Sequence, residues 1–145
     1  MIKKCLITCL LALLATSSHA EAKQQAAGFS LTRYTQAQHD KVSLICDKPL
    51  SVGSFQQCHL DIFQQDDANK RLKNAKISIG GGMPAHHHGL PTSPVVSWSA
   101  EKNYYVIEGL KFSMPGEWEL RFLIENKPGT HHKAFEEKVI FKFTL

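Results

Sequence analysis

The sequence predicts an all-β protein, an immunoglobulin-like β-sandwich of about seven to eight antiparallel strands. From Phe29 onward, apolar and polar residues alternate in short runs, which is the pattern of strands with one buried face. Turn residues such as Val52-Gly53-Ser54 and Asn126-Lys127-Pro128-Gly129 separate these runs, and no later segment has the period of an amphipathic helix. Because alternation does not show which strand edges pair, a closed barrel is the alternative.

The first predicted element is a cleavable secretory signal helix at residues 1–20. Lys3-Lys4 precedes an apolar run, and Ser18-His19-Ala20 supplies the small residues of a cleavage site. The run is shorter than the roughly 20 apolar residues of a membrane helix, so we expect export to the periplasm without a stable membrane anchor. Residues 21–28 are small and polar and predict a flexible leader, followed by one domain at residues 29–145.

The alternating runs of this domain predict eight strands. The last run has the clearest pattern, because Phe141 and Phe143 fall on one face and Lys142 on the other. Trp98 and Trp118 lie in such runs, and we expect both to pack in or beside the core. The predicted strands are Phe29–Tyr34, Lys41–Cys46, Gln57–Gln64, Ala75–Ile79, Val95–Ser99, Tyr104–Phe112, Trp118–Glu125 and Lys138–Thr144.

Charge and cysteine content narrow the function classes. The chain has 17 Lys and Arg against 13 Asp and Glu, and loss of Lys3 and Lys4 with the signal leaves a net charge of +2. The basic residues are scattered, which argues against a nucleic-acid partner. Cys46 and Cys58 would be the only cysteines left after cleavage. An even count in an exported protein predicts a structural disulfide, and the spacing does not match a Cys-x-x-Cys redox or metal motif.

The run Gly80-Gly81-Gly82-Met83-Pro84-Ala85-His86-His87-His88-Gly89 carries the strongest functional signal. Three imidazoles and a thioether lie in a segment whose glycines and prolines disfavour regular structure. A second Met-Pro pair follows at Met114-Pro115. Imidazole and thioether ligands suit copper, above all Cu(I), while Cu(II) or Zn(II) could use the imidazoles alone.

In an extended segment, His86 and His88 project to one side and His87 to the other. We therefore expect His86 and His88 to be the main metal ligands. The thioether sulfurs of Met83 and Met114 would be additional soft ligands if the fold brings them together with the two histidines. The alternative is a packed turn in which the methionines fill the core and the histidines bond to backbone carbonyls. Weaker candidate ligands are His87, His131 and His132, whereas His39 and His59 are expected to have no special role.

The sequence lacks the motifs of common enzyme classes. It contains no Gly-x-Ser-x-Gly and no His-Glu-x-x-His, and the glycine run is not followed by the lysine and helix of a phosphate-binding loop. We therefore expect that the protein is not an enzyme.

Two sequence blocks resemble a known family. The first is Met83-Pro84-x-His86-x-His88-Gly89, and the second runs from Tyr105 through Gly109-Leu110 to Met114-Pro115-Gly116-Glu117-Trp118. In this order they resemble the YtkA-like/FixH-like family of small exported β-sandwich domains, over roughly residues 35–145. The resemblance implies an architecture similar to CopC-like copper carriers and a place beside copper-handling proteins. His87 and the cysteine pair depart from the family pattern, as does the lack of the membrane anchor of the FixH proteins proper.

Two functions from different classes follow. The first is a periplasmic copper carrier or accessory protein whose partner is a copper-handling or envelope protein. The second is an interaction module of the cell envelope that binds no metal, in which the histidine loop is a rigid turn and exposed edge strands pair with a partner strand. The sequence leaves the oligomeric state open.

Overall fold

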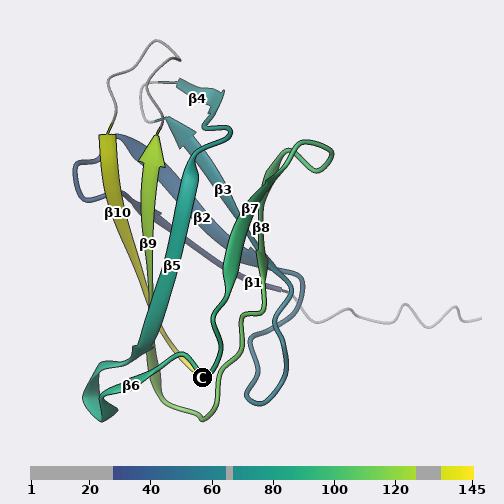
Figure 1. Ribbon diagram of the computed structural model, residues 1–145, viewed down its shortest axis with the longest axis vertical. Coiled ribbons are helices and arrows are strands. Elements are labelled where there is room, and N and C mark those ends of the chain that lie inside the picture. The colour runs from purple at the N-terminus through teal and green to yellow at the C-terminus, as the bar shows by residue number, and fades with distance from the viewer. Residues whose placement is uncertain (1–27, 65–66, 127–134) are drawn as a thin grey trace, which may run out of the picture.

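Two antiparallel sheets pack face to face in the computed structural model, which describes residues 28–64, 67–126 and 135–145 (Figure 1). The predicted all-β sandwich is therefore confirmed, with ten strands in the described part instead of seven or eight. The predicted signal helix at residues 1–20 and nearly all of the leader lie outside the described residues. Within the described ranges, no helix has the length and apolar character needed to span a bilayer.

The larger sheet has six strands. They are β1 (Phe29–Tyr34), β2 (Asp40–Cys46), β3 (Cys58–Gln64), β4 (Asp67–Arg71), β7 (Val95–Ser99) and β8 (Tyr104–Glu108). Their order is β1-β2-β3-β8-β7, with β4 paired to β3 beside this path. The smaller sheet contains β5 (Lys76–Met83), β6 (His88–Gly89), β9 (Glu117–Asn126) and β10 (Phe135–Thr144), in the order β10-β9-β5-β6. Contacts of β1 with β10 and of β5 with β7 join the two sheets.

The inner faces of the two sheets form one apolar core, as strand alternation predicts. In β10, Phe141 is fully buried and Phe143 is partly buried, while Lys142 is exposed. The core positions expected for the tryptophans are confirmed, since Trp118 is buried and Trp98 packs against the core. The fully buried side chains include Leu44, Leu60, Ile62, Tyr105, Leu110, Phe112, Trp118, Leu120, Phe122, Ile124 and Phe141.

Several predicted boundaries were wrong. Strand β4 occupies Asp67–Arg71, where the sequence predicted no strand, and its Arg71 pairs with Asp61 and stacks over the ring of Phe63. Strand β8 stops at Glu108 instead of Phe112, because Gly109 adopts a positive φ of 76° that no regular strand continues. Strand β5 continues through the glycine run to Met83, where the sequence predicted a loop.

The predicted disulfide between Cys46 and Cys58 is confirmed. The two cysteines lie directly opposite each other in the β2–β3 pair, and both are buried in the core. The bond therefore fixes the register of these two strands at the end where the long connection between them begins.

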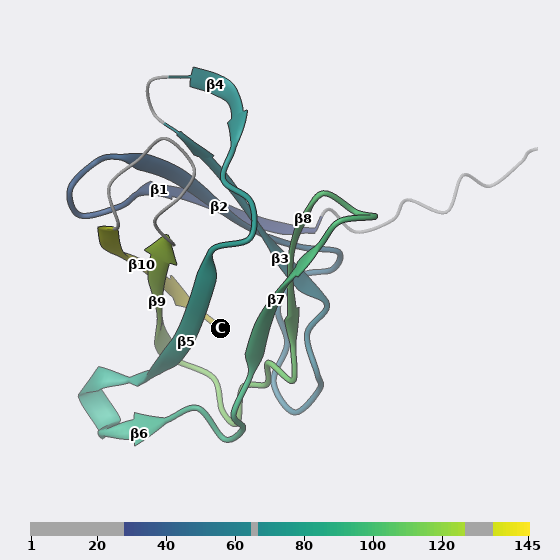
Figure 2. The ribbon, with the colours of Figure 1, turned by 45° about the horizontal axis from the view of Figure 1, so that its top comes forward.

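Residues 84–88, which we call the histidine turn, connect β5 to β6 at one end of the sandwich (Figure 1). Strand β4 lies at the opposite end (Figures 1 and 2). The C-terminus closes the same end as the histidine turn. There the backbones of Gly116 and Leu145 exchange two hydrogen bonds, of 3.0 Å and 2.9 Å. The segment before β9 is thus tied to the last residue of the chain beside the turn.

Candidate metal centre

The histidine turn is a short 3-10 turn and not the extended segment that the sequence predicted. Residues Pro84–His86 form the 3-10 helix η1, and His87 follows in the left-handed region with φ of 53° and ψ of 26°. Proline suits the first position because it lacks an N–H group and its φ is already near the helical value. The N–H of His87 donates to the Pro84 carbonyl at 3.4 Å, and β6 then pairs back onto the end of β5.

Two glycines let β5 approach its neighbouring strands closely. A Cβ atom at Gly82 would lie 2.1 Å from the carbonyl oxygen of His88 on β6, and one at Gly81 would lie 2.5 Å from the carbonyl oxygen of Glu119 on β9. Real Cβ atoms do not approach backbone that closely, so both positions require glycine. At Gly80 a Cβ would meet nothing within 4 Å. Gly81 and Gly82, but not Gly80, therefore serve close backbone packing beside the turn.

The rings of His86 and His88 lie together in spite of the wrong prediction of extended backbone. Their centroids are 6.2 Å apart and their planes differ by 28°. All three histidines of the turn are exposed. Within the ranges that the structure describes, no group of three or more His, Cys, Asp or Glu side chains is placed to hold a metal ion. The turn thus offers a pair of imidazoles to solvent.

The two methionines have different surroundings from the histidines. Met83 is only 1% exposed, and its methyl group occupies the space over Gly116, where a Cβ would lie 2.6 Å from it. Met114 is partly buried against the core, and its carbonyl oxygen accepts a hydrogen bond of 3.0 Å from the indole N–H of Trp118. Both side chains therefore contribute to packing, and their role as metal ligands stays a prediction. His131 and His132 lie outside the described residues.

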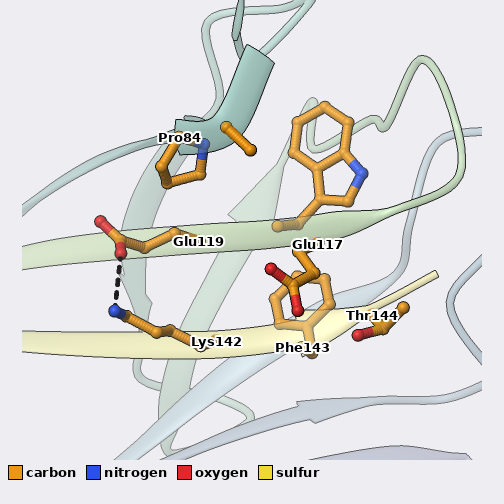
Figure 3. Close-up of a pocket in the computed structure, with 8 residues that line it drawn as sticks. Pro84, Glu117, Glu119, Lys142, Phe143 and Thr144 are labelled. Atoms are coloured by element: carbon orange, nitrogen blue, oxygen red, sulfur yellow. Dashed lines mark ion pairs between the residues drawn. The ribbon is translucent and has the colours of Figure 1, made fainter. Parts of the chain in front are cut away.

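A cavity of about 470 Å³ adjoins the turn on its β9–β10 side (Figure 3). Pro84 and Ala85 of η1 line it together with Trp118, Phe143 and the acidic pair Glu117 and Glu119. Arg121 hydrogen-bonds to Glu119 at 2.7 Å, and Lys142 lies 3.5 Å from its other oxygen. The Arg121 hydrogen bond, supported by Lys142, lowers the pKa of Glu119 below its ordinary value. Glu119 is therefore engaged by two cations of its own sheet.

Sequence reasoning missed the contacts of the two remaining histidines of the described chain. His59 stacks on Tyr104 with ring centroids 4.1 Å apart, and Nδ1 of His39 lies 2.6 Å from Oε1 of Glu137. Neither partner is near its histidine in the sequence, so no local sequence pattern predicts these two contacts. His39 was expected to have no special role, yet it joins the β1–β2 turn to β10.

The fold and the site define a small β-sandwich domain that presents an exposed histidine pair on a Met-Pro turn. A family model described as YtkA-like matches residues 34–122, which is more than half of the chain. The chain therefore belongs to the YtkA-like family. No curated protein and no solved structure matches it significantly.

Proposed function

We propose that this YtkA-like domain is a periplasmic copper carrier or accessory protein that holds the ion on His86 and His88. The observation that supports the proposal is the 6.2 Å separation of the two ring centres. An ion bound to one imidazole nitrogen lies about 3.2 Å from the ring centre, since metal–nitrogen bonds are about 2 Å long. Two rings on opposite sides of one ion have centres at most about 6.4 Å apart, so the observed separation is close to the upper limit for a shared ion.

The chemistry of the turn favours copper over hard cations. Magnesium and calcium require several oxygen ligands, whereas the turn supplies imidazole nitrogen without an acidic side chain of its own. Two protein nitrogens leave the other positions of the ion open, which suits an ion that is handed to another protein. The short turn limits the backbone freedom that binding would remove, because Pro84 restricts one end and the β5–β6 pairing the other.

Metal titration of the purified protein tests the proposal. We expect about one equivalent of Cu(I) or Cu(II) to bind with affinity above that of a competing chelator, and His86→Ala/His88→Ala to abolish this uptake. His87→Asn is the matched control, because it removes an imidazole from the same turn while asparagine tolerates the left-handed backbone. Uptake that survives the double substitution would exclude this turn as the binding site.

One observation favours a second function, an interaction module that binds no metal. Strand β7 is an edge of the larger sheet, and its first residue, Val95, is 59% exposed. An exposed apolar edge can accept a strand of a partner. Thermal melts separate the two functions, because an ion that binds the native state raises the melting midpoint and the interaction module predicts no shift with copper.

A further inference from the structure

A buried acidic cluster lies where the turn between β1 and β2 meets β10. The turn is held by two backbone donors, since the N–H of Gln36 donates to the Lys138 carbonyl at 2.8 Å and the N–H of Ala37 donates to Oε2 of Glu137 at 3.2 Å. Nδ1 of His39 approaches the other oxygen of Glu137. Glu137 is only 4% exposed. One buried carboxyl group thus fastens a turn of the larger sheet to the smaller sheet.

Asp40, the first residue of β2, adds a second buried carboxyl group to this cluster. Asp40 is 1% exposed. Its backbone makes two hydrogen bonds with Thr35: the Asp40 N–H donates to the Thr35 hydroxyl at 3.2 Å, and the Thr35 N–H donates to the Asp40 carbonyl at 2.9 Å. Its Oδ2 atom is buried and has no hydrogen-bond partner among the described residues. Both carboxylate oxygens of Glu137 have hydrogen-bond partners, whereas Oδ2 of Asp40 has none among the described residues.

We propose that Asp40 is a proton-binding site, whose protonated carboxyl group stabilises the attachment of the β1–β2 turn to β10 and whose ionisation weakens it. An ionised carboxylate needs several hydrogen bonds or a cation to offset burial, and one beside a second carboxyl group also meets repulsion. A neutral carboxyl group avoids both costs and gains a donor that can face the other carboxylate. The cluster therefore favours a single proton on Asp40.

The charges around Asp40 support this assignment. Burial, and to a smaller extent the negative charge of Glu137, raise the pKa of Asp40 to about 6 against an opposing effect of His39. The Tyr105 hydroxyl of β8 accepts a hydrogen bond from the Ala75 N–H and interacts electrostatically with Asp40, and burial raises its pKa to about 12, so it adds no charge near neutrality. The neighbouring residues Thr35 and Gln64, the latter opposite Asp40 on β3, are uncharged.

The direction of the stability change follows from this pKa. The folded chain binds the Asp40 proton more tightly than the unfolded chain, where the pKa is near 3.8. The stabilisation is therefore complete below about pH 4 and is lost as the pH rises through about 6. Because each pKa unit is a tenfold change, the proton alters the unfolding equilibrium constant by the order of a hundredfold.

Two measurements on the purified protein test the proposal. Carbon-detected NMR of the Asp40 carboxyl group gives its midpoint directly, and we expect it near pH 6 in the wild type. Denaturant unfolding between pH 4 and 8 gives the second readout, in which Asp40→Asn removes about a hundredfold of the pH dependence of the unfolding constant. Over the same range, we expect the protection factors of the Gln36 and Ala37 N–H groups, which correct for the intrinsic rise of exchange with pH, to fall once the wild type loses the proton.

Matched variants make the result decisive. Asp47→Asn makes the same chemical change at an exposed aspartate and should leave the pH dependence intact. His39→Gln removes the group that opposes the shift and should raise the Asp40 midpoint above the wild-type value. An Asp40 midpoint below about pH 4.5 would overturn the proposal. An equal pH dependence in Asp40→Asn and wild type would overturn it as well, and the wild-type NMR titration decides the question even if that variant does not fold.

Discussion

Replacement of Met83 separates the packing role of this residue from a role as a copper ligand. Met83 is almost wholly buried, and its methyl group fills the space over Gly116. Met83→Ala would empty that space, and Gly116 cannot easily move into it, because two hydrogen bonds hold its backbone to Leu145. Truncation of a buried methionine costs about 2 to 5 kcal/mol, depending on how far the site collapses. We expect the free energy of unfolding to fall by about 3 to 4 kcal/mol.

Met83→Leu is the companion variant. It conserves volume and removes the thioether, so we expect a loss of less than about 1.5 kcal/mol in unfolding free energy. Denaturant unfolding at pH 5 measures both variants, and copper titration of Met83→Leu then reports the sulfur alone. Weaker Cu(I) binding by a leucine variant of near wild-type stability would assign the thioether as a ligand. A loss below about 1 kcal/mol in Met83→Ala would refute the packing argument.

Two further predictions concern the backbone. Gly82→Ala places a methyl group against a carbonyl of β6 and should cost more than about 2 kcal/mol while weakening copper binding. Gly80→Ala, with open space at its Cβ, should change stability by less than about 1 kcal/mol, and denaturant unfolding with metal titration compares the pair. Cys46→Ser/Cys58→Ser should lower the unfolding free energy by about 3 kcal/mol, as expected for a loop of this size, and equal melting midpoints would disprove a stabilising disulfide.

Much of the sandwich could be predicted because strand signals are local. The alternation in β10 assigned Phe141 to the core and Lys142 to solvent, and the structure agrees. Strand β4 could not be predicted, since its residues Asp67 and Asn69 are typical of turns. Pairing with β3 and the contacts of Arg71 with Asp61 and Phe63 determine its structure instead. Tertiary contacts there outweigh local propensity.

The structure of the glycine run in the candidate site also depends on tertiary contacts. Three adjacent glycines before a proline predict a loop, because glycine costs conformational entropy in a strand. In the structure they continue β5, and two of them are required because the backbones of β6 and β9 come too close for any side chain. That requirement arises from strands that are remote in the sequence, so no local pattern contains it.

The sequence by itself determined the alternating strands, the disulfide partners and the segment that presents the histidines. These features depend on neighbours a few residues away or on a simple count of cysteines. Only the tertiary structure decided that Met83 is buried over Gly116, that the rings of His86 and His88 lie 6.2 Å apart, and that Asp40 and Glu137 are both buried and interact electrostatically. Burial, ring separation and the interaction of the two carboxyl groups depend on which segments become neighbours, and the packing of the two sheets sets that arrangement.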